Sequence, residues 1–409
     1  MTEKTPATRP LETADWTPAP CDLCGGQVTI RLGERAYTVR GRTRDFEMNF
    51  EDAACAACGF VFAARRPDSG FLMAYYRDAH IGHRGGELHF DGEKRLAAVA
   101  ERTPKGGRVI EIGANDGAFC AKLTEMGFDA FGLDPVEADE AESVGKGFIG
   151  EGRSGIAEPR SADTVVAYYV LEHVIDANAW LAELIDLLKD GGTLILEVPN
   201  YETHPGDSLN PEHLLHFTPR SLRELLVRHG LEPEDGLEAT VRYGQAIAAK
   251  LVDRAKAARP AEPSDVYFDD AAAALERAQA AYKVAKAERT RRTLVAHAAA
   301  ELAAEADPSG KASVFAWGAN EYAERVAPLL TERFETVRVI DRSASKIGTP
   351  FPGLDTSIAG TDVIAEADRR IFLLCSPNWN RQIADEIAAS GWEALAVIDA
   401  VTGEILSAQ

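Results

Sequence analysis

The four cysteines nearest the start of the sequence form two closely spaced pairs, Cys21/Cys24 and Cys55/Cys58. Each Cys-x-x-Cys sequence is a tight turn that directs two thiolates toward one point, and two such turns complete a tetrahedral site of four sulfur ligands. A site of this kind has no open coordination position and is typical of structural zinc. A redox-active pair is the alternative, but neither pair lies in the strand–helix–strand context of a thioredoxin-like motif. The sequence therefore predicts structural zinc.

A glycine-containing turn, EIGANDG, occupies residues 111–117. Gly113 and Gly117 would let a ligand approach the backbone where a first strand passes into a first helix, which is where open α/β sheets bind nucleotides. A pyrophosphate-binding turn has the pattern G-x-G-x-x-G, whereas the spacing here is G-x-x-x-G. Glu111 would repel a pyrophosphate and attract the cationic amino-acid portion of S-adenosylmethionine. The turn therefore predicts S-adenosylmethionine as the cofactor.

Two later segments complete the predicted cofactor site. Asp134 ends the second strand-like run and is placed to accept hydrogen bonds from both ribose hydroxyls. The sequence YVLEHV, residues 169–174, ends the next strand-like run and should pass beside the methionine portion. The predicted cofactor-binding residues are Glu111, Gly113, Asn115, Asp116, Gly117, Asp134, Pro135 and Leu171.

The elements that would position these residues alternate between strand and helix. RVIEIG, DAFGLD, TVVAYYV and TLILEVPN are short apolar runs typical of buried strands, and AFCAKLTEMG and NAWLAELIDLLKDGG have the apolar spacing of helices. This alternation predicts a mainly parallel sheet with helices on both faces. The rhythm returns after Gly310 in SVFAWG, TVRVID, RIFLLCSPN and LAVIDA, which predicts a second, smaller α/β domain.

The remaining segments have a different character. Residues 246–308 are rich in alanine with interspersed charges, which favours one long helix or a hairpin of helices serving as a spacer or a dimer contact. The predicted fold class is α/β, with a disordered lead-in (1–20), a small zinc-binding β module (21–70), a central class I (Rossmann-like) S-adenosylmethionine-dependent methyltransferase domain (71–245), a helical connector (246–308) and a C-terminal α/β domain (309–409).

The charge balance restricts the partners of the chain. A formal charge of −21 repels phosphate backbones, and we find no dense run of Lys and Arg interleaved with aromatic residues to offset it. A zinc-ribbon RNA methyltransferase is therefore disfavoured, and we expect no nucleic-acid partner. The polar, Pro-rich start and the lack of any run of about 18 apolar residues predict a cytoplasmic protein with no membrane partner.

In the order of these modules the chain resembles the zinc-containing sugar C-methyltransferases, which act on nucleotide-linked 4-keto deoxysugars in secondary metabolism. The two Cys-x-x-Cys pairs, EIGANDG, and FAWGAN and VIDRSASKIGTPFPG in the last domain match the family's pattern. The resemblance extends from Cys21 to about Ala400. It implies a nucleotide-linked sugar as the small-molecule substrate and a C-terminal domain that contributes to binding it.

The resemblance also implies a catalytic segment. The family's Tyr-His-Glu-His motif corresponds here to NPEHLLHFT, in which Glu212 and His213 match the family's acid and its histidine base. His173, in LEHV, matches a histidine that faces the same pocket. LEHV and EHLLHF are also widespread in other methyltransferases, where such histidines are often packed structural residues.

The chain departs from the family in two places. Asn210 and Pro211 stand where the family has tyrosine and histidine, and the connector AHIGHR replaces a tyrosine- and serine-rich run. His80 and His83 in that connector are therefore further candidate catalytic residues. These changes leave the acceptor open.

The candidate catalytic residues suit a proton-removing site. Transfer to carbon requires a base that removes a proton beside a carbonyl and donors that hold the enolate oxygen. A carboxylate such as Glu212 would fix the tautomer of His213, which accepts the proton, while His80, His83 or His173 supplies a donor. C-methylation of a keto-deoxysugar is the favoured function. O-methylation of a sugar or another small metabolite is the alternative, and a catalytically silent binding protein is disfavoured by the intact EIGANDG and the Glu-His pair.

Overall fold

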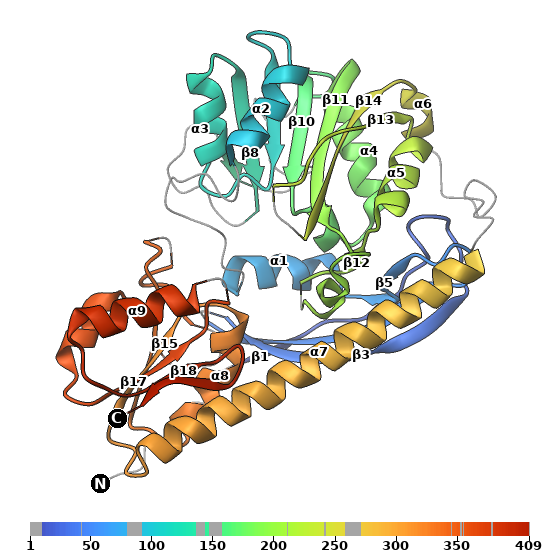
Figure 1. Cartoon of the computed structure of the whole chain (residues 1–409). Helices are drawn as coiled ribbons and strands as arrows, with labels where there is room; N and C mark the ends of the chain where they lie inside the picture. The colour runs from blue at the N-terminus through green and yellow to red at the C-terminus, as the bar shows by residue number, and fades with distance from the viewer. Residues whose placement is uncertain are drawn as a thin grey trace. The chain divides into compact units, whose positions relative to one another are not determined.

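The structure is a computed structural model of the 409-residue chain. It describes every residue except 1–9, 42, 80–91, 136–143, 147–157, 211, 241–242, 258–270, 345, 352–353, 355, 378 and 409. The chain divides into two compact units, one of Met1–Thr38 and Arg44–Lys286 and the other of Val39–Thr43 and Ala287–Gln409. The first unit holds an N-terminal β module and a large α/β sheet, and the second holds a smaller α/β domain (Figure 1).

A five-stranded sheet forms the N-terminal module. Its strands are β1 (Leu11–Thr13), β3 (Thr29–Arg40), β4 (Asp45–Cys55), β5 (Val61–Ala63) and β12 (Leu215–His216), in the order β1-β4-β5-β12 with β3 paired to β4. Phe46, Met48 and Phe50 are buried at alternate positions of β4, so the strand presents one apolar face. Helix α1 (Ser69–Asp78) follows, and its first turn is capped by the side chain of Asp68.

The prediction of a disordered lead-in is wrong for residues 10–20, the part of it that the structure describes. β1 pairs in parallel with β4, with Leu11 opposite Asp45, and β2 (Thr17–Pro18) pairs with β6 (Arg65–Arg66). The ring of Trp16 packs edge-on against Phe50 with 5.0 Å between centroids. Burial of this aromatic contact offsets the entropy of ordering a polar, Pro-rich segment.

A seven-stranded, mainly parallel sheet confirms the predicted α/β core of the first unit. The strands are β7 (Arg108–Ile112), β8 (Asp129–Asp134), β9 (Val144–Lys146), β10 (Ala162–Tyr168), β11 (Leu188–Pro199), β13 (Leu231–Glu234) and β14 (Gly244–Leu251), in the order β13-β14-β11-β10-β7-β8-β9. β14 runs antiparallel to both of its neighbours, β11 and β13, and the other strand pairs of the sheet are parallel. The helices are α2 (Gly92–Arg102), α3 (Ala118–Glu125), α4 (Ala177–Leu187), α5 (Pro219–Arg228) and α6 (Arg254–Ala257) (Figure 1). Strand order reverses between β7 and β10, the position where such sheets bind ligands.

Two boundaries differ from the prediction. β14 continues to Leu251, so the sheet includes residues that we assigned to the helical connector. β11 begins at Leu188 rather than at Thr193, because Asp190, Gly191 and Gly192 continue the strand instead of ending helix α4. The added part of β11 pairs with β10: Leu188 lies opposite Ala162, and the register shifts before Thr193 pairs with Thr164, so residues 189–192 form an irregular stretch of the strand.

Helix α7 (Ala271–Ala306) is one continuous helix of 36 residues, which confirms the single-helix alternative. Within the first unit its Ala278 packs against Ala54 and Val61 of the N-terminal module. The Tyr282 hydroxyl donates to Asp52 Oδ2 at 3.0 Å. Small alanine side chains let the helix backbone approach closely, which explains why this stretch is so alanine-rich.

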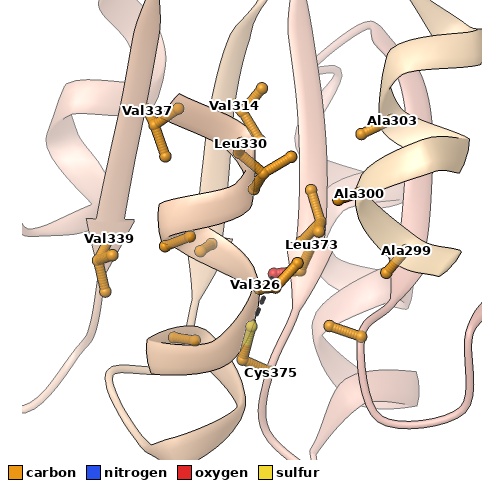
Figure 2. Close-up of a cluster of buried hydrophobic side chains, with 14 of the residues drawn as sticks. Ala299, Ala300, Ala303, Val314, Val326, Leu330, Val337, Val339, Leu373 and Cys375 are labelled. Atoms are coloured by element: carbon orange, nitrogen blue, oxygen red, sulfur yellow. Dashed lines mark hydrogen bonds between the residues drawn. The ribbon is translucent and has the colours of Figure 1, made fainter. Parts of the chain in front are cut away.

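The second unit is the predicted smaller α/β domain. Its sheet has the order β16-β15-β17-β18-β19, from strands β15 (Ser313–Trp317), β16 (Thr336–Ile340), β17 (Arg370–Leu374), β18 (Ala394–Asp399) and β19 (Glu404–Ala408), with helices α8 (Glu321–Thr331) and α9 (Asn380–Ser390). Figure 2 shows Val326 and Leu330 of α8 directed toward Val314 and Leu373 of the sheet. Ala299, Ala300 and Ala303 of α7 close this core on another side.

Candidate cofactor turn and histidine cluster

The four N-terminal thiols meet in a buried cluster. Cys21 Sγ lies 3.6 Å from Cys58 Sγ, Cys24 Sγ lies 3.5 Å from Cys55 Sγ, and all four sulfur atoms lie within 4.8 Å of one another. Four thiolates bound to one ion at ~2.3 Å stand ~3.8 Å apart in a tetrahedron, close to the two short separations here. The cluster therefore has the donor set and the spacing of a tetrahedral metal site.

Glycines shape both thiol turns. Gly25 and Gly59, which follow Cys24 and Cys58, adopt φ values of 71° and 73° that favour glycine. A Cβ atom on Gly26 would lie only 3.0 Å from Cys55 Sγ, so the backbone there approaches the sulfurs closely. Such an approach lets backbone N–H groups face thiolate charge.

The first thiol turn is also fixed to the large sheet's helices. Asp22 forms a buried ion pair with Arg66 and accepts a hydrogen bond from the backbone N–H of Ala177 at 3.0 Å, at the start of α4. Arg228 of α5 donates to the carbonyl of Leu23 at 2.6 Å. Binding of a metal at the thiols would therefore stabilise the position of the module against these helices.

The glycine turn after β7 has the geometry expected of a nucleotide-binding turn. Gly113 and Gly117 have φ of 79° and 78°, and Gly117 precedes the first turn of α3. A Cβ on Gly113 would lie 2.7 Å from Val170 Cγ2, so only glycine fits beside the end of β10. Asp134 Oδ2 accepts a hydrogen bond from the backbone N–H of Asn115 at 2.9 Å. The end of β8 and the turn after β7 thus meet at one point.

The other predicted cofactor residues line the same region of the sheet. Glu111 is buried on β7, where Cys120 Sγ donates to Oε2 at 3.2 Å, and burial raises the pKa of Glu111 to about 7. Asp116 Oδ1 accepts from the N–H of Ala118, the first residue of α3. Pro135 directly follows β8, and Leu171 is fully buried in the short 3-10 helix η1 (Leu171–His173) after β10.

Sequence reasoning missed a buried ion pair at the ends of β10 and β11. Arg95 of α2 donates through Nε to Glu197 Oε2 at 3.0 Å and lies 4.2 Å from the centroid of the Tyr168 ring. Glu197 also accepts from the backbone N–H and the hydroxyl of Thr240. Tyr169 is held at φ 59°, an uncommon conformation for a bulky residue, with its hydroxyl 3.2 Å from Glu197 Oε1. An acid inside the apolar run TLILEVPN is the signal that could have indicated it.

Asp207 is the acid that contacts the predicted base, His213. It lies in the 3-10 helix η2 (Pro205–Leu209), and its two carboxylate oxygens accept from His213 Nδ1 at 2.5 Å and His216 Nδ1 at 2.9 Å. Burial opposes ionisation of Asp207, but the charge of His213 and the hydrogen bonds lower its pKa well below the usual range. Burial likewise opposes charging of His213, yet the Asp207 carboxylate raises the pKa of His213. His216 is a packed residue of β12.

Glu212 does not orient His213, which corrects our expectation for this pair. Its Oε1 accepts from the hydroxyl of Tyr75 in α1 at 2.7 Å. Neighbouring residues of an irregular loop direct their side chains to different sides, so adjacency in the sequence gave the wrong partner. The signal for the true partner was an acid six residues earlier, in the loop HPGDSLN.

His173 joins His213, while His80 and His83 lie outside the described residues. His173 Nδ1 donates to the carbonyl of Glu212 at 3.0 Å, and its ring stands edge-on to that of His213 with 4.7 Å between centroids. Glu172, beside His173, is 1% exposed, and burial raises its pKa to about 8.

The N-terminal module holds the loop that carries this cluster. Arg35 of β3 forms a buried bidentate pair with Asp52 of β4, through Nε at 2.6 Å and Nη2 at 2.7 Å. Its Nη1 donates to the carbonyl of Asn210 at 2.6 Å. β12 then pairs with β5, with His216 opposite Val61. The histidine loop is therefore an integral part of the module's sheet.

Comparison with known proteins agrees with this geometry. Residues 84–235 match the family model described as a methyltransferase domain. A probable S-adenosylmethionine-dependent methyltransferase of Mycolicibacterium smegmatis is 31% identical over 169 residues, which cover 37% of this chain and 66% of that protein. A ubiquinone biosynthesis O-methyltransferase of Bradyrhizobium sp. is 28% identical over 129 residues, covering 29% of this chain and 50% of that protein. The chain thus spans about half to two thirds of these relatives.

Among solved structures, the chain is similar to a Burkholderia thailandensis 1,6-didemethyltoxoflavin N1-methyltransferase with bound S-adenosylhomocysteine. The identity is 21% and the TM-score 0.31, covering 40% of this chain and 77% of that one. The family match and the relatives together establish that the chain carries an S-adenosylmethionine-dependent methyltransferase domain. No helix among the described residues has the length and apolarity needed to cross a membrane.

Proposed function

We propose that this chain methylates a small polar metabolite with S-adenosylmethionine, and that its acceptor is a carbon of a nucleotide-linked keto-deoxysugar. The observation that carries the proposal is the His213–Asp207 pair, since a buried histidine with its Nδ1 on a carboxylate has its Nε2 available as a base. Residues 309–409 bind the nucleotide portion of the substrate, as the family resemblance implies.

In this proposal, different residues of the first unit have different roles in the reaction. S-adenosylmethionine supplies a methyl group on a sulfonium, a good leaving group, so the chain must align the acceptor and remove its proton. Asp134 accepts the ribose hydroxyls, and the glycine turn gives the cofactor access to the backbone. His213 takes the proton beside the acceptor carbonyl, Asp207 stabilises the imidazolium that forms, and His173 faces the same acceptor.

Replacement of His213 tests the proposed base. His213→Asn keeps a hydrogen-bonding group but removes the basic nitrogen, and it should lower turnover by ~10²–10⁴-fold while cofactor affinity stays unchanged. Near-normal turnover would place the base elsewhere, with His80 and His83 next to be replaced. NMR of the product would locate the new methyl group, and a methoxy signal would overturn the carbon assignment.

O-methylation is the second candidate, because curated relatives include ubiquinone biosynthesis O-methyltransferases. With a hydroxyl acceptor, His213 would take the hydroxyl proton during transfer, so the same variant would lose turnover. Only the position of the methyl group separates the two candidates.

We also propose that Cys21, Cys24, Cys55 and Cys58 bind one structural zinc ion. The buried, closed set of four thiols supports it. Metal analysis should find at least one zinc per chain, and Cys55→Ser should unfold the N-terminal module because metal binding and folding are coupled. Metal-free protein whose four thiols titrate freely in the folded state would contradict the assignment.

A further inference from the structure

Three side chains converge at the end of η1 and in the loop before β12. One ligand atom each from Glu172, His173 and His213 lies within 4.8 Å of the others. His173 Nε2 is 3.9 Å from Glu172 Oε1. Two imidazoles and one carboxylate are a common donor set for divalent transition metals.

The hydrogen bonds of the two histidines fix which nitrogen of each can bind a ligand. A carbonyl oxygen only accepts, so His173 Nδ1, which contacts the Glu212 carbonyl, carries the proton. Asp207 holds the proton of His213 on Nδ1 in the same way. In its neutral form, each of the two imidazoles therefore carries its ring lone pair on Nε2. Histidines that bind metals usually donate their other N–H to a carboxylate or a carbonyl, the two partners seen here.

Glu172 provides an independent observation. Its side chain is buried, and within the described part of the chain neither carboxyl oxygen has a hydrogen-bond partner. A buried carboxylate without a partner is strongly unfavourable, so such groups bind a cation or stay protonated. Here the Nε2 lone pairs of His173 and His213 would bind that cation together with the carboxylate.

We propose that Glu172, His173 and His213 form a second metal site, which binds a divalent transition-metal cation. Metal bonds of 2.0–2.2 Å place tetrahedral ligands ~3.4 Å apart, so the 3.9 Å pair needs to close by only ~0.5 Å. Three protein ligands leave one position open, in contrast to the closed four-thiol cluster. The imidazole nitrogens favour Zn²⁺ or Co²⁺ over Mg²⁺ or Ca²⁺, which prefer oxygen ligands.

If His213 is the base, as the proposed function states, a cation at this site affects turnover. The cation would occupy His213 Nε2, the atom proposed to accept the acceptor's proton. Cation binding and proton removal would then exclude each other, so excess cation should inhibit turnover.

Co²⁺ titration of the full chain, with zinc at the four thiols only, tests the site directly. One Co²⁺ per chain should bind beyond the zinc, with the weak visible bands of nitrogen and oxygen ligands and none of the intense thiolate charge-transfer absorption. Glu172→Gln removes a ligand and should weaken Co²⁺ binding by ~100-fold or more, and Asp207→Asn by ~10–100-fold. Glu212→Gln is the matched control. It keeps the carbonyl that orients His173 and should leave Co²⁺ affinity within about twofold.

Retained zinc and an unchanged Tm would show that Glu172→Gln is folded, and His173→Gln provides a second ligand variant if it is not. Absence of Co²⁺ binding beyond the zinc, or equal affinity in the wild type and both ligand variants, overturns the site. If His213→Asn loses turnover and no cation binds beyond the zinc, the metal site is wrong, and the proposal that His213 is the base is retained. Activation by bound Co²⁺ would support the site and overturn the role of His213 as the base.

Discussion

The two units contain the same turn with different charges around it. In the first, the N–H of Asn115 donates to Asp134 Oδ2 at 2.9 Å, and in the second, the N–H of Ala319 donates to Asp341 Oδ2 at 2.9 Å. Both turns follow a first parallel strand through a glycine with positive φ, and both acids end or directly follow the neighbouring strand. The acid-to-turn hydrogen bond is therefore a structural device of such sheets, and by itself it does not identify a ligand.

The surroundings of the two turns distinguish them. Two residues before its glycine, the first turn has the buried carboxyl of Glu111, whereas the second has Ala316. Beside the second turn, Lys346 Nζ donates to the Ala319 carbonyl at 3.0 Å and to Asp341 Oδ2 at 3.3 Å. The first turn therefore favours a cationic ligand such as S-adenosylmethionine, and in the second a lysine already balances the acid.

Matched replacement of the two acids gives the largest contrast. Asp134→Ala should weaken S-adenosylmethionine binding by about 1–3 kcal/mol, roughly 5- to 150-fold in Kd, through loss of a charged hydrogen-bond acceptor. Asp341→Ala removes the same turn contact and should leave that Kd unchanged. Calorimetric titration of both variants measures the difference. Equal affinities for Asp134→Ala and the wild type would show that the ribose binds elsewhere.

Glu111 should make the stability of the first unit depend on pH. Its pKa is raised by burial from 4.5 to about 7, so the folded state holds a proton that the unfolded chain releases, and stability falls as pH rises through that window. The side chain of the variant Glu111→Gln does not titrate, so its stability does not fall in this way. Relative to the wild type it should gain about 2 kcal/mol of unfolding free energy between roughly pH 5.5 and roughly pH 8.5.

Denaturant unfolding of the cofactor-free protein at the two pH values measures this gain. Glu125→Gln, on the exposed surface of α3, is the control and should show no such trend. A constant difference between Glu111→Gln and the wild type would mean that Glu111 keeps an ordinary pKa when folded.

The sequence was sufficient for features that depend on local pattern. The EIGANDG turn and the position of Asp134 at the end of the second strand follow from strand-to-helix periodicity and glycine spacing, and the thiol cluster follows from two Cys-x-x-Cys turns. The two α/β sheets follow from the alternation of apolar strand-like runs with helical segments.

Features that depend on long-range packing could not be predicted. The acid beside His213 is Asp207 and not the adjacent Glu212, because loop geometry decides which side chains meet. Arg35, which supports the histidine loop from β3, looks in the sequence like an exposed strand residue, although it is fully paired with Asp52. Nothing in the local pattern indicates that β12 joins the sheet of the N-terminal module.

The smallest expected effect tests whether Lys346 is only a balancing charge. The side chain is one-third exposed, and such ion pairs contribute ~0.2–1 kcal/mol. Lys346→Met keeps the apolar stem, so it should lower the stability of the second unit by about 0.5 kcal/mol, and the loss should shrink as salt is raised from ~0.05 to ~0.5 M. Thermal unfolding at the two salt concentrations measures it. A loss several times larger and insensitive to salt would show that Lys346 holds the turn through its contact with the Ala319 carbonyl, since a hydrogen bond that shapes a turn is not screened as a surface ion pair is.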